Sequence, residues 1–301
     1  MRVALTGASG FIGSVTARCL HENGHTVTAL VRATSRTDHI EPFVDRIVVG
    51  DQCDTACWPN LLDEAECIIH NSVDWEPLRS DQPDLARHLD TNLRTSIRLL
   101  HAAAPRQFIF VSTVGVHHDM RPRWQGLIDE DHPLRPSSLY GAYKAAVEAH
   151  LWAAHYGNGQ STSALRPCAV YGIDPNLGRS IGYPIIQQIA AGDRFVKQGG
   201  GKFVHVEDVA AAIVGCVGNE ATSAQAYNLA DCYARWADLA VMASEILGVE
   251  AAVDLSSPAS SANQFSKDAA AGLGVSLDRG HDGIRTHMKE LTVHMKDAGV
   301  I

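Results

Sequence analysis

Three residues near the middle of the chain, Thr113, Tyr140 and Lys144, have types and spacing suited to proton and hydride chemistry. Tyr140 and Lys144 are four residues apart, so they share one face if this segment is helical. A tyrosine with its ordinary pKa of about 10 releases its proton poorly at neutral pH. A nearby lysine ammonium favours the phenolate and brings the tyrosine pKa towards neutrality. We therefore predict that Tyr140 is a catalytic acid/base and that Lys144 is its partner.

Thr113 completes this set because it follows Gln107–Val111, an apolar run typical of a buried strand. Its hydroxyl can hold a substrate oxygen within reach of Tyr140, and the adjacent Ser112 is expected at the same place, beside a cofactor. Each residue alone has an ordinary structural explanation, since tyrosine and lysine occur four apart on many helices. Their order, at the end of a strand and the start of a helix, indicates hydride transfer to or from a carbonyl or an alcohol.

A glycine-rich turn at the start of the chain is the expected site of the hydride carrier. Residues 6–13 read Thr-Gly-Ala-Ser-Gly-Phe-Ile-Gly, between a short apolar strand at 3–5 and a helical pattern. Glycines in such a turn permit the tight bend, the approach of backbone to a pyrophosphate and close helix packing. The helix N-terminus adds free N–H groups and positive dipole. We predict dinucleotide binding by Gly7, Ser9, Gly10, Phe11, Ile12 and Gly13.

The residues after the second predicted strand, His25–Val31, bear on which dinucleotide binds. An acidic residue about 20 positions after the glycines would bind the ribose hydroxyls of NAD. This chain has Arg32 there, followed by Arg36, and a guanidinium can clamp a 2′-phosphate bidentately. The alternative is a solvated surface arginine. We predict NADP(H), with NAD less favoured, and we place Asp51 beside the adenine, whereas Asp54 can also cap the next helix.

The order of the predicted elements indicates an α/β fold. Apolar runs alternate with helical patterns about six times, with strands predicted at 3–5, 25–31, 46–50, 66–70, 107–111 and 161–166 and one long helix at 84–104. This alternation predicts a Rossmann doubly wound parallel sheet, in which ligands bind at the carboxyl ends of the strands. The strand at 66–70 ends in His70, which we expect to be structural or to line the cofactor.

Beyond Gly172 the alternation is interrupted, which indicates a smaller C-terminal α+β substrate-binding region. The later elements are predicted as strands at 203–206, 227–230 and 251–255, helices at 185–191 and 236–247, and two polar helices towards Ile301. We therefore predict two domains. Residues 1–172 and 203–231 form the dinucleotide-binding Rossmann domain, and residues 173–202 and 232–301 form the substrate-binding region.

Composition excludes several other classes of protein. The 301 residues carry a net charge of −9 with no basic cluster, which argues against nucleic acid as a partner. No apolar run approaches the roughly 20 residues of a membrane span, and the first strand leaves no room for a signal peptide. Seven cysteines, mostly in apolar stretches, fit reduced thiols, so a cytoplasmic location is expected. The cysteines and histidines, including His117-His118-Asp119, lack a convincing metal-ligand spacing, so no metal site is expected.

Six segments resemble the extended short-chain dehydrogenase/reductases of the NAD(P)-dependent epimerase/dehydratase superfamily. They are Thr6–Gly13 (T-G-x-x-G-x-x-G), Asp90–Leu100 with its asparagine at 92, Val111–Thr113, Tyr140-x-x-x-Lys144, Leu165–Gly172 (L-R-P-x-x-V-Y-G) and Phe203–Ala210 (F-V-H-V-x-D-V-A). The resemblance covers about residues 1–247. It implies a Rossmann sheet, with Tyr140 as acid/base, Lys144 as its pKa partner and Thr113 as ligand of the substrate oxygen. It also implies that Pro167 and the backbone after it line the nicotinamide.

Departures from the family pattern bear on the substrate. Nucleotide-sugar members usually have a longer loop before F-V-H-V, with an arginine for the diphosphate, whereas Gln198–Lys202 offers only Lys202. Together with Arg32, this is nearer to members that reduce carbonyls with NADPH, such as the dihydroflavonol-reductase-like group. The resemblance therefore implies an NADP(H)-dependent oxidoreductase acting on a small organic substrate. Two alternatives stay open: a nucleotide-sugar epimerase or dehydratase with retained NAD, and a non-catalytic NADP(H)-binding redox sensor, which would typically lack the tyrosine.

Two further expectations concern the surroundings of this site. The segments 74–79 and 174–183 are expected to line the substrate pocket, where Trp75 and Tyr183 would give an apolar or aromatic surface. Members of the family often pair as homodimers through two long helices, which correspond here to 84–104 and 140–156. A homodimer is therefore compatible with the resemblance, and a small molecule is the expected partner of the pocket.

Overall fold

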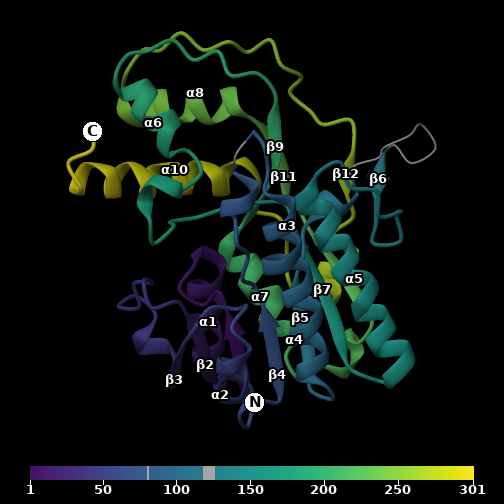
Figure 1. Ribbon diagram of the computed structural model, residues 1–301. Coiled ribbons are helices and arrows are strands. Elements are labelled where there is room, and N and C mark those ends of the chain that lie inside the picture. Colours follow the sequence, from purple (N-terminus) through teal and green to yellow (C-terminus); the bar gives the residue numbers. More distant parts are fainter. Residues whose placement is uncertain (80, 118–125) are drawn as a thin grey trace.

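The computed structural model describes residues 1–79, 81–117 and 126–301. Its centre is a parallel sheet with the strand order β10-β7-β5-β4-β1-β2-β3 (Figure 1). The strands are β1 (Arg2–Thr6), β2 (Thr26–Val31), β3 (Arg46–Val49), β4 (Cys67–His70), β5 (Gln107–Val111), β7 (Thr162–Pro167) and β10 (Gln225–Leu229). The strand order reverses between β1 and β4, and such a reversal opens a crevice at the carboxyl ends of the strands. The predicted Rossmann-type α/β fold is confirmed.

Helices cover both faces of this sheet, because its strands are apolar on both sides. In β1, Val3 and Leu5 pack into one cluster of buried side chains and Ala4 packs into another. The helices of the first face are α1 (Phe11–Glu22), α7 (Val206–Cys216) and α9 (Asp268–Gly272); those of the second are α2 (Trp58–Leu62), α4 (Thr95–Ala103) and α5 (Leu139–Asn158). This double coverage fixes the strand ends on which the site is built.

The long helix predicted at 84–104 is divided into three segments. It consists of α3 (Leu85–His88), a π-helical turn, η4 (Leu89–Arg94), and α4. The side chain of Asn92 in the π turn accepts from the amide of Asp74 at 2.8 Å and donates to its carbonyl at 2.9 Å. A π turn inside a helix is rare and is found mostly at functional sites. Periodicity did not reveal it, because the apolar spacing on either side of the turn stays helical.

The C-terminal part of the chain forms a second core, with its own sheet of order β11-β9-β8. Its elements are β8 (Ala169–Tyr171), β9 (Gly200–His205), β11 (Cys232–Arg235), α6 (Tyr183–Ala190), α8 (Trp236–Leu247) and α10 (Gly280–Asp297). Figure 1 shows α6, α8 and α10 gathered on one side of the main sheet. The assignment of residues to two domains stays a prediction.

One predicted strand is wrong. Residues 251–255 form only a single parallel bridge, between Phe195 and Val253. The Asp254 carboxylate accepts a hydrogen bond from the Ser256 amide at 2.9 Å, and this local turn ends the extended pairing. Residues 203–205 of the strand predicted at 203–206 belong to β9, which lies in the small sheet, and Val206 begins α7.

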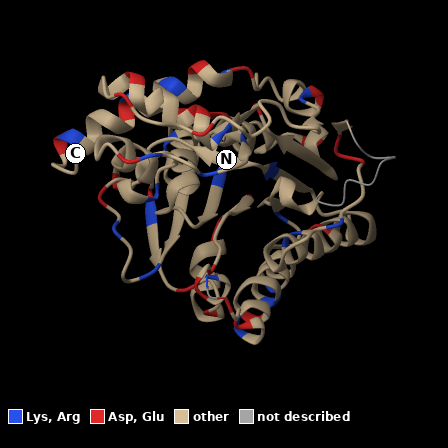
Figure 2. Ribbon diagram, turned by 90° about the horizontal axis from the view of Figure 1, so that it is seen from above, with Lys and Arg blue, Asp and Glu red and all other residues tan. Residues whose placement is uncertain are grey.

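The remaining elements are short. A pair of two-residue strands, β6 (Leu127–Ile128) and β12 (Gln264–Phe265), forms a third sheet. The 3₁₀ turns are η1 (Glu41–Phe43), η2 (Thr55–Cys57), η3 (Glu76–Leu78), η5 (Val114–Val116), η7 (Leu177–Arg179) and η8 (Glu220–Thr222). Figure 2 shows acidic and basic residues interspersed over the face seen from above. Among the helices that the structure describes, none is both long and apolar enough to cross a membrane.

Candidate active site

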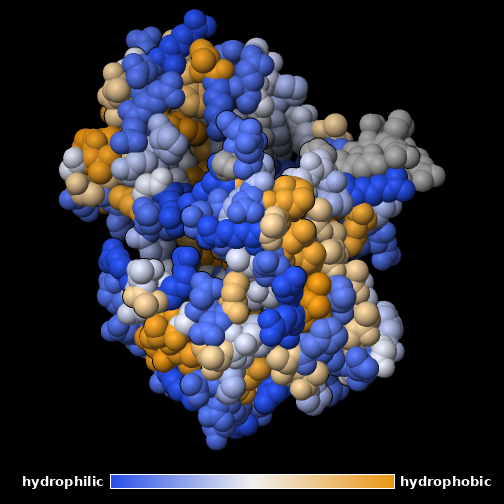
Figure 3. All heavy atoms as spheres, in the orientation of Figure 1, coloured by the Kyte–Doolittle hydropathy of each residue, from blue (hydrophilic) through white to orange (hydrophobic). Residues whose placement is uncertain are grey.

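A cavity of about 1200 Å³ lies at the carboxyl ends of the central strands. All the predicted site residues except Gly13 line it, namely Gly7, Ser9, Gly10, Phe11, Ile12, Arg32, Arg36, Asp51, Ser112, Thr113, Tyr140, Lys144 and Pro167. Figure 3 shows a hollow on this face of the molecule, with a largely hydrophilic rim, between the C-terminal elements and the main sheet. The chain thus brings together residues from both halves of the sheet and from the C-terminal core.

The glycine turn at the floor of this cavity is fixed by backbone contacts. Gly7 has φ +70°, and a Cβ there would lie 3.0 Å from the backbone of Ser72. A Cβ on Gly13 would lie 2.0 Å from the Gly7 carbonyl oxygen, so the third glycine packs α1 against the turn itself. Gly10 caps α1 without a side chain, and the first turn of α1 contains no acidic residue. The helix N-terminus is therefore open to an anion, which fits the pyrophosphate of a dinucleotide.

Buried hydrogen bonds hold this turn against β4. The Thr6 hydroxyl contacts Nδ1 of His70 at 2.8 Å, and Nε2 of the same ring contacts the Ser96 hydroxyl at 2.8 Å. Burial, followed by the charge of Lys144, lowers the pKa of His70 to about 3. His70 is thus neutral at physiological pH, and it is not among the residues that line the cavity. His70 therefore has a structural role, because it joins Thr6 to Ser96.

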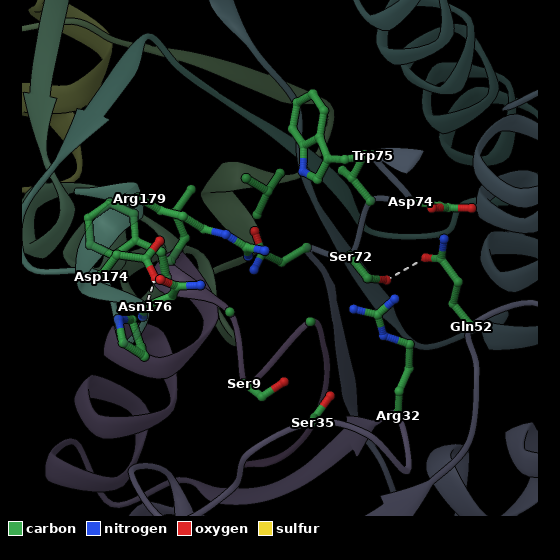
Figure 4. A pocket seen from close by; sticks show the side chains of 18 of the residues that line it. Ser9, Arg32, Ser35, Gln52, Ser72, Asp74, Trp75, Asp174, Asn176 and Arg179 are labelled. Carbon is green, nitrogen blue, oxygen red and sulfur yellow. Dashed lines mark hydrogen bonds between the residues drawn. The ribbon is translucent and has the colours of Figure 1, made fainter. Parts of the chain in front are cut away.

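The segment after β2 brings Arg32 and Arg36, the two predicted phosphate ligands, to the cavity. Arg32 is exposed, and among the described residues its side chain makes no hydrogen bond or ion pair; Figure 4 shows its side chain extending in the direction of Ser72 and Gln52. Arg36 also lines the cavity, but its guanidinium already binds Asp38, with a closest distance of 2.8 Å. Arg32 is therefore the better placed of the two arginines to take a new anion.

The carboxylates after β3 separate into two roles. Asp51 lines the cavity, as predicted. Asp54 accepts a hydrogen bond from the Ala56 amide at 2.9 Å and caps η2, which was the alternative for this residue. Gln52, which the sequence did not single out, also lines the cavity and accepts from the Ser72 hydroxyl at 2.5 Å (Figure 4).

Tyr140 and Lys144 lie one turn apart on α5, as predicted, and both line the cavity. Lys144 is almost fully buried; its Nζ donates to the Val111 carbonyl and lies 5.7 Å from the centre of the Tyr140 ring. Burial lowers the pKa of Lys144 to about 7, against the opposing charge of Glu148. Burial also raises the pKa of Tyr140 well above its ordinary value. The lowered tyrosine pKa expected from the pairing is therefore not seen, because burial of Tyr140 raises its pKa and the Nζ of Lys144 bonds a backbone carbonyl.

The two hydroxyls at the end of β5 point to different partners. The Thr113 hydroxyl accepts a hydrogen bond from the Gly115 amide at 3.1 Å, which leaves its own proton available for a substrate oxygen. The Ser112 hydroxyl instead donates to the buried carboxylate of Glu148. Ser112 still lines the cavity, but its hydroxyl is committed to the core.

A buried ion pair beneath the site was missed by the sequence reasoning. Glu148 and Arg166 are nearly inaccessible, and Arg166 Nη2 donates to Glu148 Oε2 at 2.7 Å. Arg166 Nη1 also contacts Nε2 of His117 at 3.0 Å, and burial together with this arginine lowers the pKa of His117 to about 4. The pair ties α5 to β7 directly behind Lys144 and Ser112. Its signal in the sequence was Glu148, four residues after Lys144, and Arg166, in the L-R-P segment.

Trp75 forms one wall of the cavity and stacks on Tyr140. The ring centroids are 4.7 Å apart and the ring planes are inclined by 29°. Trp75 is 43% exposed, so the stacked indole still presents surface to the cavity. Tyr183, the other aromatic residue expected there, packs against the C-terminal core and is not among the cavity-lining residues.

The opposite wall comes from the segment after β8. Asp174, Asn176 and Arg179 line the cavity, and the Asp174 carboxylate accepts from the Asn176 amide at 2.7 Å (Figure 4). Figure 4 shows the Arg179 side chain extending into the cavity from this wall. The sequence placed the segment at the pocket but did not single out Arg179.

In residues 1–79, 81–117 and 126–301, no group of three or more His, Cys, Asp or Glu side chains could hold a metal ion. His118 and Asp119 of the histidine-rich run lie outside the described residues. The cavity is lined by hydroxyl groups, a lysine, arginines and backbone N–H groups. These groups suit a phosphorylated dinucleotide and an oxygen-bearing substrate.

Comparison with known proteins agrees with this geometry. The sequence model of the NAD dependent epimerase/dehydratase family matches residues 3–230. A 3-diazoavenalumate denitrifying reductase from a Streptomyces species is 30% identical over 234 residues, 74% of this chain and 74% of the relative. A UDP-glucose 4-epimerase from Corynebacterium glutamicum is 28% identical over 209 residues, 64% of this chain and 60% of the relative.

Among solved structures, the UDP-glucose 4-epimerase of Thermus thermophilus, in complex with NAD, has the same fold. It superimposes with a TM-score of 0.78 at 21% identity, covering 97% of this chain and 99% of that chain. The chain therefore belongs to the NAD dependent epimerase/dehydratase family, and it is an NAD(P)-dependent oxidoreductase-type enzyme of the extended short-chain dehydrogenase/reductase kind.

Proposed function

We propose that this enzyme is an NADP(H)-dependent carbonyl reductase, equivalently an alcohol dehydrogenase, for a small organic substrate. The observation that carries the proposal is that Tyr140, Lys144 and Thr113 line the same cavity as the glycine turn and Arg32. A reductase among the relatives, 30% identical to this chain, supports the same class of reaction.

The residues for holding the cofactor follow the length of the cavity. The N–H groups at the start of α1 would hold the pyrophosphate, and Arg32 with Ser35 would hold a 2′-phosphate. Pro167 and Val170 line the end nearest the catalytic residues. When bound there, the nicotinamide supplies or accepts the hydride.

Residues of the chain hold the substrate oxygen and transfer the proton to it. Thr113 donates its hydroxyl hydrogen to the substrate oxygen and holds that oxygen near Tyr140. The Tyr140 hydroxyl makes no hydrogen bond within the described residues, so it is available to deliver its proton to the oxygen as negative charge develops there. The resulting phenolate favours the ammonium form of Lys144, whose pKa near 7 allows it to take up a proton readily. The Glu148 carboxylate behind Lys144 favours the same charged form.

A second candidate is a nucleotide-sugar epimerase or dehydratase that retains NAD, favoured by the 28% identity to a UDP-glucose 4-epimerase. Such a substrate carries a diphosphate that needs cationic ligands. Lys202, the only cation that the short loop before F-V-H-V offers, donates to the Ser261 hydroxyl at 3.0 Å and is not among the residues that line the cavity. This loop therefore offers the cavity no cationic ligand for a diphosphate, which supports the reductase.

Identification of the nucleotide and of the substrate class separates these two functions. The purified enzyme is denatured and any released nucleotide is identified. The native enzyme is then tested for oxidation of NADPH and NADH with aldehydes, ketones and nucleotide sugars. The proposal predicts little retained NAD and faster oxidation of NADPH with aldehydes or ketones. Stoichiometric release of NAD, together with conversion of a nucleotide sugar and no carbonyl reduction, would establish the second candidate instead.

A further inference from the structure

Two side chains at the substrate end of the cavity, Trp75 and Arg179, take no part in the proton transfer described above. We propose that the substrate is a planar, conjugated carbonyl compound bearing a carboxylate or similar anionic oxygen group, which stacks on Trp75 and places its anion at Arg179. The inference rests on the proposed function and extends it to a class of substrate.

Trp75 offers a flat surface beside the reacting group. One face of the indole stacks on Tyr140 at 4.7 Å, yet 43% of the residue is exposed. An aromatic ring in this position gains from an offset or stacked partner beyond the area that is buried. A planar carbonyl compound packed against the exposed part of the indole would lie beside Tyr140, whereas a bulky aliphatic ring would make poorer contact.

The loop that carries Trp75 is held in place before any substrate arrives. Asn92 binds both the amide and the carbonyl of Asp74, at 2.8 and 2.9 Å. Arg87 bridges the carboxylates of Asp74 and Glu76, at 3.2 and 2.7 Å. Little conformational entropy is therefore lost when a ligand packs against the indole, and a preformed surface of this kind favours affinity.

Arg179 extends into the same cavity from the opposite wall. It is exposed, lines the cavity, points into it in Figure 4 and has no ion pair among the residues that the structure describes. Arg36 and Arg87, by contrast, are already bound to carboxylates. The guanidinium of Arg179 is thus free to bind a carboxylate bidentately.

The charge around the substrate end also favours an anion. Arg79, on the Trp75 side, is a second exposed arginine of the cavity without an ion pair to the described residues. Asp174 is the acidic residue of the opposite wall, and its carboxylate accepts the Asn176 amide. The two arginines outnumber that carboxylate, so a neutral substrate would leave positive charge in the cavity without an anionic partner. The pyrophosphate of the cofactor is the other anion that could meet Arg179, although the open N-terminus of α1 already provides for it.

Matched pairs of aldehydes test the anionic part of the proposal. The probes are 4-formylbenzoate and 4-formylcinnamate, each compared with its methyl ester, with NADPH as reductant. The wild-type enzyme should show a kcat/KM at least about tenfold higher for the acid than for the ester at one of the two lengths, as expected for a charge-assisted hydrogen bond. No preference for the acid at either length overturns the proposal.

The variant Arg179→Gln shows whether this arginine is the source of the preference. We expect the acid-to-ester ratio to fall about tenfold while the Kd for NADPH, measured by fluorescence, stays within twofold. Arg194→Gln, which removes an exposed charge outside the cavity, is the control and should keep the wild-type ratio. An unchanged ratio in Arg179→Gln, or an equal loss for acid and ester together with weaker NADPH binding, contradicts the proposal; the latter would assign Arg179 to the pyrophosphate.

A second pair of probes tests the planar part. Wild-type enzyme should prefer methyl 4-formylbenzoate to methyl 4-formylcyclohexanecarboxylate, and Trp75→Leu should reduce that preference several-fold while Trp75→Phe restores most of it. A preference that is the same in all three proteins rules out stacking on Trp75. If neither these aldehydes nor any aldehyde or ketone of the panel described above oxidises NADPH or NADH, the proposed reductase function itself has failed; if the neutral esters react without preference, only this inference has failed.

Discussion

The two sides of the cavity are built differently. On the cofactor side, backbone defines the shape: Gly7 and Gly13 tolerate no Cβ, and the start of α1 has no side-chain cap. On the substrate side, exposed side chains define it, with Trp75 on one loop and Arg179 on another. The cofactor side can hardly vary without losing its ligand, whereas the substrate side can change its specificity by changing one side chain.

This difference explains what family membership does and does not convey. Backbone geometry of the glycine-turn type suits any dinucleotide, so it does not distinguish between the reductase and the epimerase to which this chain is similar. The choice of substrate depends on loops, which carry the variable part of binding and catalysis in most folds. Substitutions that alter one side of the cavity at a time therefore test this contrast.

The variant Gly13→Ala tests the cofactor side most severely. Its Cβ would lie 2.0 Å from the Gly7 carbonyl oxygen, and a backbone atom cannot move aside without opening the turn. We expect the Kd for NADPH to rise at least about 100-fold, or roughly 2.7 kcal/mol. Gly157→Ala in α5, where an added Cβ meets nothing within 4 Å, is the control and should bind normally. Normal binding by Gly13→Ala would show that the turn is not the rigid element described here.

Lys144 lies between the two sides, and its burial predicts a pH dependence of stability. Its pKa is lowered from 10.5 to about 7, so between those values the unfolded chain binds a proton that the native protein lacks. Native stability due to this group therefore decreases as the pH falls from 10.5 to 7, and the loss is complete below pH 7.

Replacement of this lysine removes that cost. In urea unfolding, the free energy of unfolding of Lys144→Met, relative to that of wild type, should increase by on the order of 2 kcal/mol when the pH is lowered from 9 to 6. Because both proteins are compared at each pH, other titrating groups largely cancel. A difference between variant and wild type that is equal at both pH values would mean that Lys144 is charged throughout this range.

Arg32→Asp tests the side-chain element of the cofactor side. A carboxylate repels a 2′-phosphate and can bind ribose hydroxyls, so the ratio of kcat/KM for NADPH to that for NADH should fall about tenfold or more. The matched variant Arg36→Asp should change the ratio less, because its arginine is already bound to Asp38. If both variants leave the ratio of wild type, the arginines do not select the cofactor.

The smallest effect is expected from Arg87→Ala on the substrate side. This change frees Asp74 and Glu76 and loosens the loop of Trp75, but the ion pairs are largely exposed and Asn92 remains in place. We expect stability to fall by at most about 1 kcal/mol and KM for an aromatic aldehyde to rise a few-fold, with NADPH binding unchanged. A large loss of NADPH affinity would show that the two sides are not separable in this way.

The sheet and the cofactor side were predictable because local pattern determines them. Apolar runs at β1, β2, β4, β5 and β7 need burial on both faces, and the strand–turn–helix at residues 6–13 carries its own signature. Tyr140 and Lys144 share a helix, so their spacing alone brings them together. The strand predicted at 251–255 failed because a side chain, Asp254, turned the backbone.

The features that sequence did not reveal depend on contacts between distant segments. The Glu148–Arg166 pair joins α5 to β7, and the stacking of Trp75 on Tyr140 joins a loop to the start of a helix that lies far along the sequence. The π turn at Asn92 follows from its hydrogen bonds to Asp74 rather than from helical periodicity. The raised pKa of Tyr140 likewise follows from burial, which spacing does not report.

We propose that Tyr140 transfers the proton in a cavity whose cofactor side is independent of it. The most direct test is Tyr140→Phe, with turnover of an aldehyde and the Kd for NADPH measured on the same preparation. We predict that kcat falls at least about 1000-fold, a loss of roughly 4 kcal/mol of transition-state stabilisation, while NADPH binds within twofold of wild type. Turnover of the variant at the wild-type rate would contradict the account.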